Sequence, residues 1–309
     1  MAGDKWGRMP PVTCPFFIIA GPTGVGKSDL AVAVAEHCGG EIVGADAFQI
    51  YRGLEILTAQ PSAELRARAP HHLTGEIPLT QSFDVAQYLR AARQRIAEIR
   101  ARGRVPIVTG GTGLYLRALT RGLAELPGAD AKVRAELEKE PLADLQRRLT
   151  KLDPIGAAQI DLQNSRRVIR ALEICLLTGR PFSSFREQWI GTPHGIGGIV
   201  LTLDRETLNA RIDQRTAAMF AAGVIEEVRA AGEAGPTASQ TLGFREIHAL
   251  IAGQLAPADC IAAIRHATRR YAKRQMTWFR RETALEPIDL AHSSDLDQLA
   301  ESLARKAAG

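Results

Sequence analysis

Short apolar runs alternate with amphipathic stretches over the first third of the chain. Three runs, Pro15–Ala20, Gly40–Ala45 and Val105–Thr109, are bounded by turn residues or helix formers, as buried strands are. Before the third run, apolar residues recur at spacings of three and four, which predicts an amphipathic helix with Val85, Tyr88, Leu89, Ala92, Ile96 and Ile99 on its inner face. This alternation predicts an α/β fold in which a parallel sheet is flanked by helices.

The pattern changes near residue 130. The stretch Asp130–Trp189 has no strand-like run and is rich in Arg, Leu, Ala and Glu, so it predicts a helical insertion. A further strand is predicted at Gly198–Leu203, and the remainder is expected to be helical, with a Gly/Pro/Ser break at 232–243. We therefore expect a catalytic core formed by residues 13–125 and 197–309, interrupted by a helical insertion domain at 126–196.

The first predicted strand leads into a phosphate-binding loop of the P-loop NTPase type. Its pattern G-x-x-x-x-G-K-[ST] is completed by Gly21, Pro22, Thr23, Gly24, Val25, Gly26, Lys27 and Ser28. Glycines let backbone N–H groups surround a phosphate, the lysine adds a charge, and the serine hydroxyl suits Mg²⁺. Helix formers follow, so the phosphate would lie at a helix N-terminus. The loop predicts a phosphorylated ligand without saying which one.

Composition indicates the class of protein and its cellular compartment but does not indicate the reaction. Of 309 residues, 45% are hydrophobic and 24% charged, as in ordinary globular proteins. The four cysteines lie far apart and form no C-x-x-C pair, so neither a zinc ribbon nor a disulfide framework is indicated, and a reducing cytoplasm is the simplest setting. No apolar run is long enough to span a membrane, and residues 1–12 read as a frayed end without a signal peptide.

The net charge of +5 is concentrated near the C-terminus. Between Asp259 and Glu282 there are seven Lys/Arg residues against two acids, with Tyr271, Trp278 and Phe279 among them. Such a helix suits binding to a phosphate backbone. A solvated amphipathic helix whose aromatic side chains face the core explains the pattern equally well.

Two more segments are expected to meet the loop at the carboxyl edge of the sheet. Asp46 follows the second strand, where a carboxylate can hold Mg²⁺ through water or accept a proton from a nucleophile. The turn Gly110–Gly113, with Thr112, follows the third strand and offers backbone donors and a hydroxyl. An N-cap aspartate and a plain tight turn are the alternative interpretations.

Eight ordered blocks carry a resemblance to a known family. They are the phosphate loop, the segment Asp46–Gly53, Thr58-Ala59 before Pro61, Pro70–Leu73, Gly110–Tyr115, Arg167–Glu173, Gly243–Glu246 and Lys273–Arg280. Together they resemble the bacterial tRNA dimethylallyltransferases, also called tRNA isopentenyltransferases, from about Phe16 to Arg280. The loop alone is not specific, whereas so many blocks in one order are.

The resemblance implies transfer of a dimethylallyl group from dimethylallyl diphosphate to tRNA. The acceptor would be N6 of the adenosine 3′ of the anticodon, position 37, in tRNAs that read codons starting with U, and diphosphate would be released. The P-loop would then hold the diphosphate of the prenyl donor, with Mg²⁺ near Ser28. The resemblance also implies a monomer in the cytoplasm without membrane contact.

The resemblance also assigns roles to individual residues. Asp46 would be the general base, Thr112 would contact the reacting region, and Arg215 would bind the diphosphate. The family's tRNA-contacting positions correspond here to Asp46, Ala47, Phe48, Gln49, Thr112, Arg134, Arg166, Arg167, Arg170, Arg245, Lys273, Arg274, Gln275, Thr277, Trp278 and Arg280. From the residues alone, Arg215 could be a helix-surface arginine paired with Asp213 or Glu206, and Trp278 is better explained as a core residue.

The chain departs from the family pattern at several positions, and the residues alone also allow other functions. Ala45 and Ala47 stand where the family usually has serine, and Gln60 where it has lysine, which puts supporting contacts in doubt. His71 and His72 are expected to fix a loop and not to bind a metal. The competing functions are a small-molecule P-loop kinase, prenyl transfer to free AMP or ADP, and a non-catalytic RNA-binding switch driven by a nucleoside triphosphate.

Overall fold

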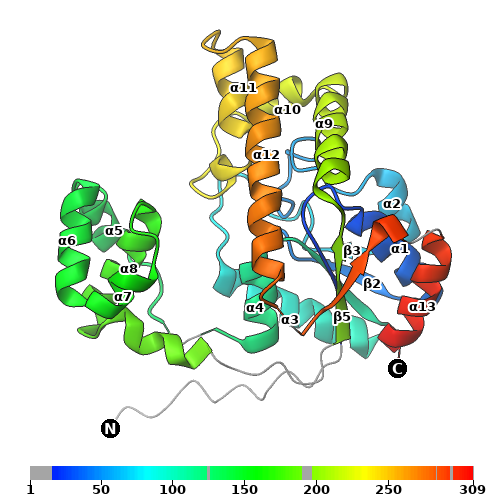
Figure 1. The fold of residues 1–309 in the computed structure, drawn as a ribbon, viewed down its shortest axis with the longest axis horizontal. Coiled ribbons are helices and arrows are strands. Elements are labelled where there is room, and N and C mark those ends of the chain that lie inside the picture. The colour runs from blue at the N-terminus through cyan, green and yellow to red at the C-terminus, as the bar shows by residue number, and fades with distance from the viewer. Residues whose placement is uncertain (1–15, 124–125, 190–196, 283, 293–294, 309) are drawn as a thin grey trace. The chain divides into compact units, whose positions relative to one another are not determined.

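The protein is described by a computed structural model covering residues 16–123, 126–189, 197–282, 284–292 and 295–308 (Figure 1). The chain divides into two compact units, one formed by residues 1–120 and 193–309 and the other by residues 121–192. Residues 190–196 of the predicted insertion, the frayed end predicted at 1–12, and Pro15 of the first predicted strand lie outside the described residues.

A parallel six-stranded sheet forms the centre of the larger unit. Its strands are β1 (Phe17–Ala20), β2 (Glu41–Gly44), β3 (His71–His72), β4 (Pro106–Gly110), β5 (Gly197–Thr202) and β6 (Glu286–Asp289). Their order is β3-β2-β4-β1-β5-β6, and every neighbouring pair is parallel. The central strands are buried on both faces, which is why they read as continuous apolar runs. The predicted α/β fold with a parallel sheet is confirmed.

Helices cover both faces of this sheet and extend beyond one end of it (Figure 1). They are α1 (Lys27–Cys38), α2 (Ala63–Arg68), α3 (Val85–Ala101), α4 (Gly113–Arg121), α9 (Arg205–Ala221), α10 (Val224–Ala231), α11 (Phe244–Ile251), α12 (Pro257–Phe279) and α13 (Leu296–Ala308), with single turns of 3₁₀ helix at 238–240 and 290–292. Helices α1 and α13 pack in one apolar cluster with β1 and β5. Helices α9 to α12 stand side by side at the end of the sheet where the phosphate-binding loop lies.

The smaller unit is helical and has its own core. It contains α5 (Ala131–Leu137), α6 (Leu142–Leu152), α7 (Pro154–Gln159), α8 (Ser165–Thr178) and a 3₁₀ segment at 182–189. Leu145, Leu149, Val168 and Leu172 are buried within it. Asp153 caps α7 by accepting from the Gly156 N–H at 2.8 Å, and it also binds Ser183. The sequence predicts this helical structure for residues 130–189.

Two strands differ from the sequence expectation. Residues 71–72 form the short strand β3 and not a loop, because Ile42 and Val43 of β2 pair with His71 and His72. The C-terminal segment is not wholly helical, since β6 pairs with β5 from Ile199 to Thr202. Both are edge strands, and β6 carries Pro287 and exposed side chains, so neither has the apolar pattern that marks a buried strand.

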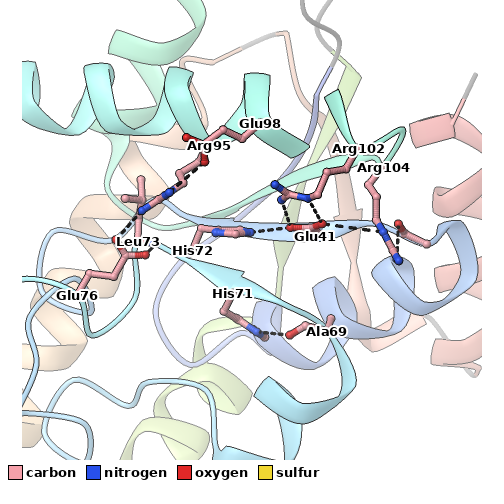
Figure 2. Close-up of polar contacts among 11 residues, drawn as sticks. Glu41, Ala69, His71, His72, Leu73, Glu76, Arg95, Glu98, Arg102 and Arg104 are labelled. Atoms are coloured by element: carbon pink, nitrogen blue, oxygen red, sulfur yellow. Dashed lines mark hydrogen bonds and ion pairs between the residues drawn. The ribbon is translucent and has the colours of Figure 1, made fainter. Parts of the chain in front are cut away.

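A buried carboxylate, Glu41, lies at the amino ends of the strands, whereas the phosphate-binding loop follows their carboxyl ends. Figure 2 shows its partners. Glu41, at the start of β2, is 4% exposed and accepts from His72 Nε2 at 2.7 Å and from Arg102 Nη2 at 2.6 Å. The guanidinium of Arg104 lies 4.0 Å away. Burial alone would raise the pKa of Glu41, but hydrogen bonds from Arg102 and His72 outweigh it and lower the pKa below its ordinary value. The charge therefore ties β2, β3 and the end of α3 together.

Candidate functional site

The phosphate-binding loop connects β1 to the N-terminus of α1. Gly24 and Gly26 have φ values of 85° and 103°, the left-handed region that favours glycine. Lys27 Nζ donates to the Pro22 carbonyl at 2.7 Å, and Arg211 Nη1 donates to the Val25 carbonyl at 3.1 Å. The backbone N–H groups at the start of α1 have no partner within the helix, so they are available to an anion.

Lys27 is half-buried beside Asp46 and Arg215. Desolvation lowers its pKa to about 8, while the Asp46 carboxylate opposes this shift and Arg215 adds to it. Desolvation also lowers the pKa of Arg215, again opposed by Asp46. Two cations facing one carboxylate leave an excess of positive charge, which a bound diphosphate would neutralise.

Asp46 lies just beyond β2, beside the loop. Its Oδ1 accepts from the backbone N–H groups of Phe48 at 2.9 Å and Gln49 at 3.3 Å. Among the described residues no donor is directed at Oδ2, so that oxygen is left to accept a proton. The turn after β4 supports this segment, because Thr112 Oγ1 accepts from the Ala47 N–H at 3.0 Å. The predicted meeting of the three loops at one edge is what the strand order β2-β4-β1 produces.

Arg215 projects from α9 toward the loop. Its Nη2 donates to Thr23 Oγ1 at 2.9 Å. Among the described residues it forms an ion pair neither with Asp213, which is paired with Arg269 of α12, nor with Glu206. Arg215 therefore lies against the phosphate-binding loop and not free on the helix surface.

A cavity of about 490 Å³, counted with its open mouth, adjoins these residues. Thr23, Asp46 and Arg215 line it together with threonines at 58, 216, 241 and 268 and with the apolar side chains of Phe48, Leu57, Met219, Leu242, Ile264 and the ring of Tyr271. Charged groups beside the phosphate-binding loop, together with the apolar wall that the aliphatic and aromatic side chains form in the same cavity, suit a ligand with a phosphorylated head and a hydrocarbon tail.

The basic segment of α12 has two different faces. Lys273, Arg274, Thr277 and Arg280 are exposed, as a nucleic-acid contact requires. Gln275 is buried, and half-buried Trp278 packs so closely on the start of α4 that a side chain at Gly113 would meet its ring at 2.3 Å. The core interpretation fits the packing of Trp278, and nucleic-acid binding by the exposed basic face stays a prediction.

The arginines predicted to contact tRNA in the smaller unit fall into two groups. Arg166 and Arg167 are exposed. Arg134 and Arg170 are both paired with the fully buried Glu173, whose Oε1 also accepts from the Asp130 N–H at 2.7 Å. Arg245, on α11 of the larger unit, is exposed. Gln49 uses its amide group to hold the Thr58 and Ala59 carbonyls at 3.1 and 2.8 Å.

Tyr271 is the site residue that the sequence did not single out. It lines the cavity, its ring lies 6.3 Å from that of Phe48, and its hydroxyl interacts with Thr112 and Gln275. Burial and the Asp46 charge raise its pKa, so the hydroxyl stays protonated. Among the interleaved aromatic residues of α12 no sequence signal separates Tyr271 from those that pack in the core.

A divalent cation at this site would depend on the ligand for most of its coordination. Within the described residues no group of three His, Cys, Asp or Glu side chains could hold a metal ion. The Ser28 hydroxyl lies next to Lys27 at the start of α1, and a hydroxyl together with phosphate oxygens and water is a donor set that suits Mg²⁺. The residues present therefore fit that ion.

Among the described helices, none is both long and apolar enough to cross a membrane.

Comparison with known proteins gives consistent matches. Residues 49–282 match the family model described as IPP transferase. The chain is 43% identical over 288 residues to the tRNA dimethylallyltransferase of Geobacter sulfurreducens, covering 90% of this chain and 93% of that protein. It is 46% identical to the protein of the same name from Anaeromyxobacter dehalogenans, covering 86% and 91% of the two chains.

Solved structures agree. The full-length tRNA isopentenylpyrophosphate transferase of Bacillus halodurans is 35% identical, with a TM-score of 0.70 and 96% of each chain covered. A eukaryotic dimethylallyltransferase captured acting on tRNA is 28% identical, with a TM-score of 0.79 over 94% of this chain and 77% of the other.

Proposed function

The chain belongs to the IPP transferase family, and we propose that it transfers a dimethylallyl group from dimethylallyl diphosphate to N6 of an adenosine in tRNA. One observation carries the proposal beyond family membership. One cavity is lined both by Thr23 of the phosphate-binding loop, Arg215 and Asp46 and by an apolar wall of aliphatic and aromatic side chains. The proposed donor combines the same two features, a charged diphosphate and a hydrocarbon tail.

The reaction is a substitution at the allylic carbon C1. The N6 nitrogen attacks C1, the C1–O bond breaks, and its electron pair leaves with the diphosphate. The N6 proton passes to the Asp46 carboxylate, whose Oδ2 accepts no protein hydrogen bond among the described residues. The bonds from Phe48 and Gln49 to Oδ1 keep the carboxylate in place while it accepts the proton.

The leaving diphosphate gains negative charge as the C1–O bond breaks. Lys27, Arg215 and the N–H groups at the start of α1 surround the position where this charge develops, and they are already oriented before the reaction. Bound Mg²⁺, held by the Ser28 hydroxyl and the diphosphate oxygens, would supply further neutralising charge. The apolar wall would bind the hydrocarbon tail and exclude water from the allylic carbon.

The acceptor base has to reach a recessed site. An adenine stacked within an RNA loop does not expose N6 to such a cavity, so the base would leave its stack. We propose the base 3′ of the anticodon, in tRNAs that read codons starting with U. The exposed basic face of α12 and the exposed arginines of the smaller unit would hold the RNA backbone. Because the proposed acceptor is tRNA, we propose a cytoplasmic reaction, and we predict a monomer.

The competing functions account for less of the molecule. A small-molecule kinase would share the phosphate loop, but it finds no support in the matched family and explains neither the apolar wall nor the basic face of α12. Prenyl transfer to free AMP or ADP does not require the helical unit at 121–192. A non-catalytic switch leaves the position of Asp46 in the cavity unexplained.

The test compares tRNA nucleosides by mass spectrometry after incubation with dimethylallyl diphosphate and Mg²⁺. We expect N6-dimethylallyladenosine with the wild type and almost none with Asp46→Ala, while Asp29→Ala, at an exposed position on α1, serves as the control and retains activity. Equal product from the Asp46 variant would remove that residue from the mechanism. Phosphoryl transfer from ATP to a small acceptor, without prenylation, would refute the proposed function.

A further inference from the structure

Gln275 on α12 is buried between two loops of the site. Its side chain is 6% exposed, and both ends of its amide are used. Oε1 accepts from the Thr23 backbone N–H at 2.9 Å, and Nε2 donates to the Gly111 carbonyl at 2.8 Å. These partners lie 252 and 164 residues away in the chain. The amide therefore connects the phosphate-binding loop to the turn that carries Thr112.

The turn after β4 is shaped to admit this amide. A Cβ atom built on Gly111 would lie 2.2 Å from Gln275 Nε2 and 3.0 Å from the Gly21 carbonyl oxygen. Contacts this short do not occur in folded proteins, so any side chain at position 111 would displace Gln275. Gly111 thus meets a steric requirement set by Gln275.

Gln275 also fixes the orientation of one peptide group in the phosphate-binding loop. The Pro22–Thr23 peptide is held at both ends, because Lys27 Nζ donates to its carbonyl while its N–H donates to Gln275. The Thr23 N–H is consequently directed at α12 and is used by Gln275. Thr23 Oγ1 accepts from Arg215, so the same residue also orients the guanidinium.

One helical turn earlier, Tyr271 contacts the same turn. Its hydroxyl interacts with the side chains of Thr112 and Gln275, and Thr112 in turn accepts from the Ala47 N–H beside Asp46. The inner face of α12 therefore reaches all three catalytic loops. Its outer face, with Lys273 and Arg274, is exposed.

We propose that Gln275 is a positioning residue that holds the phosphate-binding loop in its diphosphate-binding geometry, and that it does not contact tRNA. The identity of the substrates in this proposal rests on the proposed function, whereas the role of Gln275 concerns only the geometry of the phosphate-binding loop. Under this proposal the inner face of α12 shapes the diphosphate site and its outer face is left for RNA.

The experiment compares Gln275→Met with Lys273→Gln, a variant of the exposed face of the same helix. Three quantities are measured: the KM for dimethylallyl diphosphate, the Kd for an anticodon stem-loop RNA, and the Kd for inorganic pyrophosphate by calorimetry. Loss of the buried amide leaves the Thr23 N–H and the Gly111 carbonyl unpaired, so we expect Gln275→Met to weaken both diphosphate measurements about tenfold and the RNA Kd less than twofold. Lys273→Gln should show the reverse.

Several outcomes would overturn the proposal. A Gln275→Met protein that loses affinity for RNA alone, or for RNA and pyrophosphate equally, would contradict it. If that variant does not fold by circular dichroism, the neutral Gln275→Ala replaces it, since the space it leaves lets water reach the Thr23 N–H and the Gly111 carbonyl without linking the two loops, and weaker pyrophosphate binding is again expected. Because pyrophosphate binding needs no turnover, a wild type that binds pyrophosphate but makes no prenylated RNA would refute only the proposed function.

Discussion

The buried carboxylate at the edge of the sheet gives the sharpest stability prediction. Glu41→Gln keeps the shape of the side chain and removes its charge. In the native protein that charge accepts from His72 Nε2 and from two nitrogens of Arg102, at distances between 2.6 and 3.1 Å (Figure 2). The glutamine NH₂ group would face these donors, so at least one of the bonds is lost and a guanidinium loses its counter-charge.

The magnitude follows from how much of the cluster is buried. Breaking a fully buried ion pair costs about 3–5 kcal/mol. Here Glu41 is buried, but the Arg102 and Arg104 side chains are 48% and 52% exposed and remain partly hydrated. Discounting for that hydration, we expect a loss of about 2 kcal/mol, which lowers the melting temperature by about 4–8 °C in a domain of this size.

The assay is thermal unfolding at pH 7 with prenylation measured beside it. Because Glu41 begins β2 while Asp46 follows its other end, kcat and KM at 25 °C should stay within twofold of the wild type. Glu301→Gln, which breaks only the exposed pair with Arg305, is the matched control and should change the unfolding free energy by less than about 0.5 kcal/mol.

The pH dependence has a definite sign. The pKa of Glu41 is lowered in the folded protein, so its stabilisation is complete above the unfolded-state value of 4.5 and is lost as pH falls through the folded pKa. The difference between wild type and Glu41→Gln should therefore shrink in acid. A melting temperature of Glu41→Gln within 1 °C of the wild type at pH 7, or a difference that grows in acid, would refute the reasoning.

Three further predictions concern the site and the helical unit. The pKa of Lys27 is lowered to about 8, so its ammonium is lost as pH rises through that value, and the KM for dimethylallyl diphosphate should rise by up to about tenfold per pH unit above it; a flat profile to pH 9.5 would contradict this. Arg215→Lys keeps a positive charge but loses the planar guanidinium that reaches Thr23, so kcat in single-turnover assays should fall about a hundredfold. An unchanged kcat would exclude a role for the guanidinium. Glu173→Gln should destabilise the smaller unit by about 2–3 kcal/mol, seen as faster hydrogen exchange at 131–178 but not in the sheet; uniform protection would be the contrary result.

The central features of the fold could be predicted because they depend on local sequence. Buried parallel strands read as apolar runs, and the phosphate-binding loop is a contiguous motif, so β1, β2, β4 and β5 were placed to within two residues. The edge strands could not be predicted, since β3 has two residues and β6 is exposed and contains Pro287. Their pairing depends on neighbours distant in the chain.

The candidate site could be predicted only in part, for a related reason. Asp46 and Thr112 follow strands, so the topology of a parallel sheet brings them together. Gln275 and Tyr271 differ, because the periodicity of α12 does not say which loop its inner face meets. The hydrogen bonds of Gln275 join residues 164 and 252 positions apart in the sequence and exist only in the folded chain. The roles of Gln275 and Tyr271 can therefore be seen only from the tertiary contacts.

The position of β1 in the strand order has a consequence for biosynthesis. One neighbour, β4, is made soon after it, whereas β5 follows only after the whole helical unit has been translated, and Gln275 comes later still. A nascent chain that ends before residue 197 has an unpaired β1 edge lined with apolar side chains. Such edges invite aggregation. Ribosome-bound chains halted in the helical unit should therefore be more dependent on chaperones than chains halted after β5.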